Sequence, residues 1–136
     1  MGSESGGGLT QGPGSFHDFL SNIERRARKY PLDSENRLGT KVDEARSELL
    51  TNSPLSTAED FWRVLSHGGR VESFTTPYGP GSMATFADGS HVVWRPITKT
   101  SVKFGQDSPS IEIAVKTSGF GLPARYQIHF KKGSHT

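Results

Sequence analysis

The spacing of the hydrophobic residues changes along the chain and divides it into two parts. Up to about residue 66 the apolar residues recur every three or four positions, which is the period of an amphipathic helix. From Arg70 onward they alternate with polar residues, which is the period of a strand with one buried face. Helices followed by strands predict an α+β fold with an antiparallel sheet.

Three helices are predicted in the first part. The first begins at Ser15, whose side chain can cap the first turn, and ends before Pro31. The second begins at Thr40, and its spacing turns one group of apolar residues inward: Val42, Ala45, Leu49 and Leu50. The third runs from about Thr57 to Ser66, because Ser56-Thr57-Ala58-Glu59 has the spacing of a capping box.

A β-hairpin is predicted at Asp88-Gly89, because both turn residues can adopt positive φ at low cost. The runs on either side, Ser82–Ala87 and Ser90–Arg95, are then paired antiparallel strands. Alternation along the second strand places His91 and Arg95 on the same face, away from the core. A histidine and an arginine on one face can converge on an anion, so this hairpin is a candidate functional region.

Two later strands, residues 110–117 and 125–131, add a carboxylate and a second imidazole. Glu112 lies between two isoleucines, so it faces away from the core and toward the polar face of the sheet. His129 lies on the polar face of the last strand, and the two faces coincide if the strands pair. Lys131 shares that face. A single histidine on a strand is usually structural, so the interest lies in the combination with Glu112.

A base, an acid and a cation together suit phosphoryl transfer from an RNA 2′-hydroxyl. We assign Glu112 as the base and His129 as the acid, with Arg95 stabilising the charged phosphorus centre. Five further residues are predicted to contact substrate or phosphate: Lys99, Ser110, Thr76, His91 and Lys131. This reaction requires no metal, and carboxylates are too sparse in the chain for a persuasive two-metal nuclease.

The composition excludes several other classes of protein. The chain has 136 residues, a length typical of one domain, and contains no cysteine, which excludes disulfide scaffolds, zinc ribbons and thiol nucleophiles. Its glycine-rich stretches match neither the dinucleotide fingerprint nor a phosphate-binding loop. No histidine pair has metal-ligand spacing, and no Gly-x-Ser-x-Gly motif is present. We therefore predict no cofactor and no metal site.

Three segments organise this domain. Residues 1–14 are rich in glycine and serine and are predicted to form a flexible leader. Residues 15–66 form a helical segment that packs on the sheet, and residues 67–136 form the catalytic antiparallel sheet. No apolar run approaches the length of a membrane span, and the first residues lack the pattern of a signal peptide. We expect no interaction with membranes.

Charge is distributed unevenly along the chain. The net charge is only +2, but residues 61–136 hold nine basic and four acidic residues, a net charge of +5, whereas residues 1–60 carry −3. A basic second half suits a polyanion such as RNA, although an ordinary solvated surface explains the charge equally well. The alternative to a nuclease is therefore a non-catalytic RNA-binding or adaptor module that uses the same basic sheet face.

Five short motifs lie within about residues 67–131. They are Gly69-Arg70-Val71, Thr76-Pro77-Tyr78-Gly79, Asp88-Gly89-Ser90, Val93-Trp94-Arg95-Pro96 and Ser108-Pro109-Ser110-Ile111-Glu112-Ile113. Together they resemble the C-terminal toxin domains of bacterial polymorphic and contact-dependent growth inhibition systems. Such domains are similar to the barnase–EndoU–colicin–RelE superfamily of metal-independent ribonucleases, in which helices precede a four- or five-stranded antiparallel sheet. The loop Thr98–Asp107 is longer than that pattern, and Ser110 stands where threonine is usual.

The resemblance implies a toxin ribonuclease domain that is used in competition between bacteria, with tRNA as the expected substrate. It implies delivery as part of a larger secreted or cell-surface effector and action in the cytoplasm of the target cell. A cognate acidic immunity protein is the expected partner, and a translation factor of the target cell is a further candidate. Fold, activity and partners are expectations that follow from this resemblance.

Overall fold

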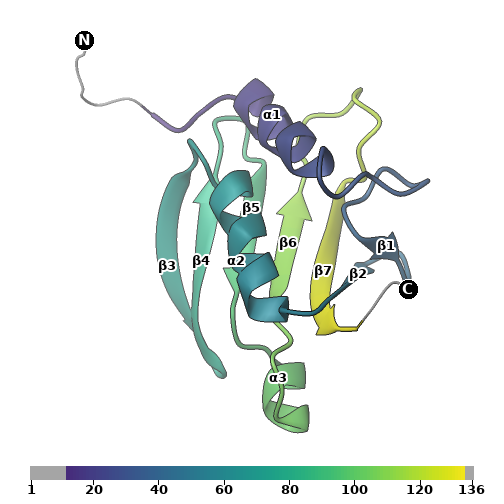
Figure 1. The fold of residues 1–136 in the computed structure, drawn as a ribbon. Coiled ribbons are helices and arrows are strands. Elements are labelled where there is room, and N and C mark those ends of the chain that lie inside the picture. The colour runs from purple at the N-terminus through teal and green to yellow at the C-terminus, as the bar shows by residue number, and fades with distance from the viewer. Residues whose placement is uncertain (1–11, 134–136) are drawn as a thin grey trace.

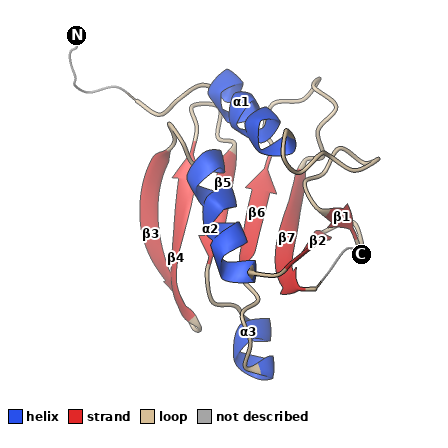
Figure 2. Ribbon diagram, viewed as in Figure 1, coloured by secondary structure: helices blue, strands red, loops and turns tan. Residues whose placement is uncertain are grey.

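A single mixed β-sheet runs through the molecule, and two helices lie across one of its faces (Figures 1 and 2). The structure, a computed structural model, describes residues 12–133, so most of the predicted leader lies outside the described residues. The helices are α1 (Phe16–Ala27), α2 (Pro54–Leu65) and α3 (Lys99–Phe104). The strands are β1 (Thr40–Lys41), β2 (Arg46–Thr51), β3 (Arg70–Thr76), β4 (Gly79–Thr85), β5 (His91–Arg95), β6 (Ser110–Ala114) and β7 (Arg125–Lys132).

The strand order of the sheet is β1-β2-β7-β6-β5-β4-β3. From β3 to β7 each strand pairs antiparallel with the next, which confirms the antiparallel arrangement predicted for the second part of the chain. The expectation of four or five strands is too low, because β2 pairs with β7 in parallel and β1 pairs with β2 antiparallel. α2 then carries the chain from β2, near one edge of the sheet, to β3 at the other (Figure 1).

α1 and α2 bury their apolar stripes against the sheet. α1 begins as predicted, since the Ser15 hydroxyl accepts the Asp18 N–H while the Asp18 carboxylate accepts the Ser15 N–H. Buried Asn22 on α1 donates to the carbonyl oxygens of Leu65 and His67 and so ties α1 to the end of α2. The buried side chains of the sheet that face this layer are Val92, Trp94, Ile111, Ile113, Tyr126, Ile128 and Phe130. The opposite face of the sheet, which these helices do not cover, is called the open face below.

The segment Thr40–Thr51 forms two strands, so the helix predicted there is wrong. Along β2 the buried residues alternate, with Ser47 and Leu49 inward, whereas Val42 is 50 % exposed. Each residue of β2 has a partner on β7, which satisfies backbone groups that a helix would have satisfied locally. The buried Arg37 guanidinium also donates to three carbonyl oxygens in the connection between β1 and β2. The partners of β2 on β7 are distant in sequence, so the local spacing was misleading.

Two helix boundaries differ from the prediction. α2 begins at Pro54, three residues before the expected start, because proline has a helical φ and no N–H that needs a partner in the first turn. The stretch Ser56–Glu59 therefore lies within the helix and does not cap it. The predicted loop between β5 and β6 contains α3, whose first turn is capped by Thr98 and Ser101 and which ends at Gly105 with φ of +63°.

The predicted hairpin forms between β4 and β5, but its turn is one residue longer than expected. The Phe86 N–H donates to the Ser90 carbonyl oxygen across Ala87-Asp88-Gly89, and Asp88 does not adopt positive φ. Gly89 supplies positive φ, at +93°. Asp88 holds the turn through its carboxylate, which accepts the Ser90 N–H and the hydroxyl groups of Ser90 and Thr117. The hairpin is thereby connected to the segment that follows β6, and the position of β5 in the sheet is fixed.

Candidate functional site

Ser110 is the centre of a row of side chains that crosses the open face. It lies opposite Arg95 on β5 and opposite His129 on β7. Opposed Cα atoms in an antiparallel pair are about 4.5–5.5 Å apart, which places Arg95 and His129 about 10 Å apart with Ser110 between them. Glu112 follows two residues later on β6 and shares this face, on the diagonal to both. The three residues predicted for catalysis therefore surround one small side chain.

The Glu112 carboxylate is bound by two guanidinium groups. Its Oε2 lies 2.7 Å from Arg125 Nη2, and its Oε1 lies 3.5 Å from Arg95 Nη1. The Glu112 side chain is only 10 % exposed, and a carboxylate this deeply placed needs such partners because it has lost most of its hydration. Both oxygens are engaged, but each keeps a second lone pair, so Glu112 can still accept a hydrogen bond from a substrate hydroxyl.

A pocket of about 490 Å³ opens beside this row of side chains. Four of the predicted site residues line it: Thr76, Arg95, Lys99 and His129. We define its cationic half as Arg95, Lys99 and His129, and its apolar half as Phe74, Tyr78 and Ile97. Glu112 does not line the pocket and is connected to it through Arg95. An anion with an attached apolar group would match both halves.

Arg95 is held on a second side by Phe74. The Arg95 Cζ atom lies over the ring of Phe74, 5.9 Å from its centroid. The ring in turn occupies space that Gly81 leaves vacant on β4, because a Cβ atom at Gly81 would lie 2.6 Å from Phe74 Cζ. Phe74 and Glu112 together position the guanidinium at the boundary between the cationic and apolar halves of the pocket.

His129 is half-buried among charged side chains. Burial lowers its pKa from the ordinary value, the positive charges of Lys131 and Arg46 lower it further, and Glu48 opposes this shift. Glu48 lies opposite His129 on β2. The neutral imidazole is therefore favoured at neutral pH in the free protein. A bound anion in the cationic half would favour the protonated form that a general acid needs.

Two predicted basic residues are engaged elsewhere. His91 lies at the other end of β5, four residues and about 13 Å from Arg95, and it does not line the pocket. Its Nδ1 lies 3.0 Å from the carbonyl oxygen of Gly89. Lys131 Nζ lies 2.6 Å from Glu48 Oε2, so its charge is paired. The structure thus separates His91 from the other site residues.

Two predicted hydroxyl groups have partners inside the protein. The Thr76 hydroxyl donates to the Gly79 carbonyl oxygen and accepts the N–H groups of Tyr78 and Gly79, so all its hydrogen-bonding capacity is used by the turn between β3 and β4. Ser110 is fully buried and accepts a hydrogen bond from Gln127 Nε2. Thr76 shapes the pocket wall, and Ser110 supports Gln127, which lines the pocket.

Three residues of this site were not among those predicted from the sequence. Arg125 binds Glu112, Gln127 lines the pocket, and Phe74 holds Arg95. Alternation along the last strand already placed Arg125 and Gln127 on the same face as His129, and that signal was sufficient to include them. Phe74 could not be found in this way, because its role depends on a contact with another strand.

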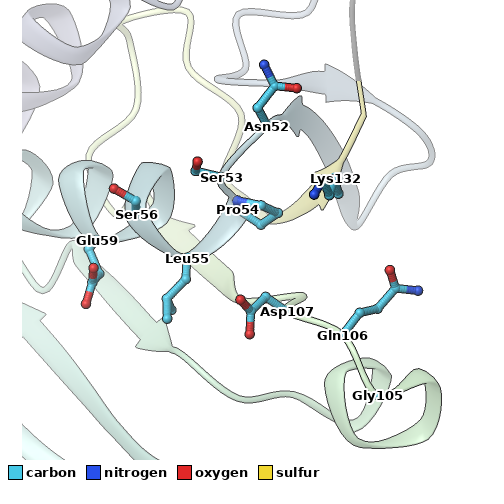
Figure 3. Close-up of a pocket in the computed structure, with 10 residues that line it drawn as sticks. All are labelled: Asn52, Ser53, Pro54, Leu55, Ser56, Glu59, Gly105, Gln106, Asp107 and Lys132. Atoms are coloured by element: carbon cyan, nitrogen blue, oxygen red, sulfur yellow. The ribbon is translucent and has the colours of Figure 1, made fainter.

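A second pocket, of about 640 Å³, lies at the start of α2 (Figure 3). It is formed by residues 52–56 and Glu59, by residues 105–107 after α3, and by Lys132 at the end of β7. It has two carboxylates, Glu59 and Asp107, for one lysine, and none of the residues predicted for the site lines it. Its charge does not suit a phosphate, so the pocket on the open face is the candidate site.

Among residues 12–133 no group of three or more histidine, aspartate or glutamate side chains is arranged to hold a metal ion. Within the same range no helix is both long enough and apolar enough to cross a membrane. The chain matches no protein-family model, no curated protein and no solved structure.

Proposed function

We propose that the chain is a toxin ribonuclease domain that cleaves RNA, with tRNA as the expected substrate and no requirement for a metal. One observation carries the proposal: Arg95, Lys99 and His129 line the same pocket, and Glu112 is bound to Arg95 at its edge. A phosphodiester needs cations around its oxygens and a proton donor and acceptor on either side. These residues supply all three, from β5, β6, β7 and the start of α3.

In the proposed reaction the 2′-hydroxyl oxygen attacks the adjacent phosphorus while its proton passes to Glu112. The bond from phosphorus to the 5′-oxygen breaks, and His129 donates a proton to that oxygen. The products are a 2′,3′-cyclic phosphate and a free 5′-hydroxyl, so atoms and charge balance. Arg95 and Lys99 bind the phosphate oxygens, which carry additional negative charge as the new bond forms.

The decisive experiment uses purified protein, tRNA and excess EDTA. We expect discrete fragments whose 5′-hydroxyl ends can be labelled by a polynucleotide kinase without prior phosphatase treatment. His129→Gln should reduce the cleavage rate by about 100-fold or more, the range typical of a lost general acid. The matched control, His67→Gln, changes an exposed histidine after α2 and should cleave normally. Intact tRNA at micromolar protein would overturn the proposal.

A non-catalytic RNA-binding or adaptor module is the second candidate. It is favoured by the engagement of both Glu112 oxygens, since a carboxylate between Arg95 and Arg125 can serve solely to position two guanidinium groups for phosphate. Such a module would bind RNA through the same open face and leave it intact. Substitution of Glu112 distinguishes the two candidates.

The biological setting is proposed from the resemblance alone. We propose that the domain belongs to a larger secreted or cell-surface effector and acts in the cytoplasm of the target cell. A cognate immunity protein with an acidic surface would cover Arg95 and Lys99, with or without a translation factor of the target cell at another surface. Co-expression of a small acidic protein from the neighbouring reading frame should suppress toxicity and co-purify with the domain.

A further inference from the structure

We infer that the apolar half of the pocket is a nucleobase subsite that favours purines without distinguishing adenine from guanine. The inference rests on the proposed function, because it takes RNA as the occupant of the pocket. The apolar half consists of Phe74, Tyr78 and Ile97 and adjoins the cationic half directly. A phosphate held by the cationic half would bring its nucleoside toward these side chains.

Two glycines on β4 make room for this apolar half. A Cβ atom at Gly81 would lie 2.6 Å from Phe74 Cζ, and one at Gly79 would lie 3.3 Å from Ile97 Cδ1. Gly79 and Gly81 are two residues apart on one strand, so they share a face of the sheet. Glycine weakens a strand and often marks a close approach of another group. Here the space that both glycines leave is used by the side chains that form the apolar wall.

The side chains of the apolar half are exposed to solvent, so they are not needed to form the buried core of the domain. Tyr78 is 39 % exposed and Ile97 is 41 % exposed, whereas the helix-facing side of the sheet is buried. Aromatic side chains beside a cationic groove are the arrangement with which proteins bind the bases and backbone of a single strand. The contact between Arg95 and Phe74 joins the two halves, because the guanidinium can bind phosphate while the ring faces the base.

Two of the hydroxyl groups that line the pocket are used inside the protein. The Thr76 hydroxyl is used within its turn, and the Thr98 hydroxyl donates to the Ser108 carbonyl oxygen and accepts the Ser101 N–H. Neither is available to read the edge of a base. When bases are selected by stacking and not by hydrogen bonds, the preference follows stacking strength, which is greater for the larger purine ring.

The test is a binding titration followed by ¹H–¹⁵N NMR, with no cleavage step. The ligands are adenosine 3′-monophosphate, guanosine 3′-monophosphate, cytidine 3′-monophosphate and inorganic phosphate. We expect the two purine nucleotides to bind equally, and about 5-fold or more tighter than inorganic phosphate, the lower end of what one base–aromatic stack contributes. The affinity for cytidine 3′-monophosphate should be lower than that for the purine nucleotides and higher than that for inorganic phosphate.

Two substitutions locate the subsite. Phe74→Leu should reduce purine affinity by a larger factor than phosphate affinity, because the ring forms the apolar half and also holds Arg95. Val71→Ala on the same strand is the matched control and should change neither. Tyr78→Ala changes an exposed turn residue, so it tests the same subsite if Phe74→Leu does not fold. Purine and phosphate affinities that are equal, or a tenfold preference for guanine over adenine, would overturn the inference.

This result is separable from the proposed catalysis. If the protein prefers purine nucleotides but leaves tRNA intact, the result would support the nucleobase subsite and contradict the proposed nuclease activity. Cleavage of tRNA without any purine preference would do the opposite.

Discussion

Arg95 and Glu112 form an ion pair on the diagonal between β5 and β6, with 3.5 Å between Arg95 Nη1 and Glu112 Oε1. In the register Arg95 lies opposite Ser110, and Glu112 lies opposite Val93. The small Ser110 side chain leaves space on the open face beside Arg95, so the guanidinium can reach along the sheet to the carboxylate. Glu112 is therefore in direct contact with a cation that lines the pocket.

Glu112→Gln separates a nuclease from a binding module. The amide cannot accept the 2′-hydroxyl proton, so we expect the rate of tRNA cleavage to fall by about 100-fold or more. Affinity for an RNA with a 2′-deoxy sugar at the cleavage position should change little, because Arg95 and Lys99 remain. The measurements are initial rates by gel and binding by fluorescence anisotropy.

The matched control for this change is Glu72→Gln. Glu72 is an exposed carboxylate on β3 of the same sheet, and its replacement should leave both quantities unchanged. Undiminished cleavage by Glu112→Gln would show that another group takes the proton, and the carboxylate would then serve only to position Arg95 and Arg125.

The strands from β3 to β7 could be predicted because their signals are local. Alternation and the Asp88-Gly89 turn are read within a few residues, and they placed Arg95, Glu112 and His129 on one face correctly. β2 could not be predicted in the same way. Its partner β7 begins about 75 residues later in the chain, and the apolar residues of β2 also fit a helical spacing.

Within the site, the sequence indicated which residues share a face but not how their side chains are engaged. The pairing of Lys131 with Glu48 and the use of the Thr76 hydroxyl in its own turn both depend on three-dimensional contacts. His91 lies on the predicted face of β5 but at the opposite end of the strand from Arg95. Alternation shows which face a residue occupies and does not show how far along the strand it lies from the other site residues. Alternation along a strand predicts the face on which a side chain lies, whereas the pairing register of neighbouring strands determines which side chains lie close together.

Gly81→Ala tests the support of Arg95 by Phe74. The added Cβ would lie 2.6 Å from Phe74 Cζ, so the ring must move away from β4. We expect a loss of stability of about 1–3 kcal/mol, the usual effect of overpacking, measured by urea unfolding. In a Phe74→Ala background the same substitution should cost less, because of the close contacts only the 2.9 Å approach of the added Cβ to the Trp94 carbonyl oxygen remains. Equal effects in both backgrounds would show that the ring is not the obstacle.

Tyr126→Phe tests a buried hydrogen bond that connects β7 to the segment before β1. The Tyr126 hydroxyl accepts the Leu38 N–H at 2.9 Å, and Leu38 is fully buried. Loss of the oxygen leaves this donor without a partner, which should reduce the free energy of unfolding by about 1–3 kcal/mol at pH 7.

The same substitution has a specific dependence on pH. Burial raises the pKa of Tyr126 to about 12, whereas the unfolded chain has the ordinary value near 10. Above pH 10 the unfolded state releases this proton first, so the stabilising contribution is complete below pH 10 and is lost between pH 10 and about 12. The stability difference between wild type and Tyr126→Phe should be constant up to pH 10 and shrink above it.

The protonation of His129 links the electrostatics of the open face to the proposed chemistry. Burial, Lys131 and Arg46 lower its pKa, and Glu48 raises it. NMR titration of the imidazole should therefore give a value below the ordinary 6.5. Arg46→Gln removes a positive charge and should move the pKa upward, and Glu48→Gln should move it downward. Arg28→Gln, on an exposed position after α1, is the control and should have no effect.

A general acid must be protonated to act, so kcat/KM for tRNA cleavage should fall as the pH rises through the pKa of His129 in the free protein. Arg46→Gln raises that pKa, and the falling limb of the pH profile should shift to higher pH by the same amount that NMR records. If the falling limb of the pH profile does not shift while the pKa of His129 does, another group donates the proton to the leaving oxygen. His129 would then serve only to bind the phosphate.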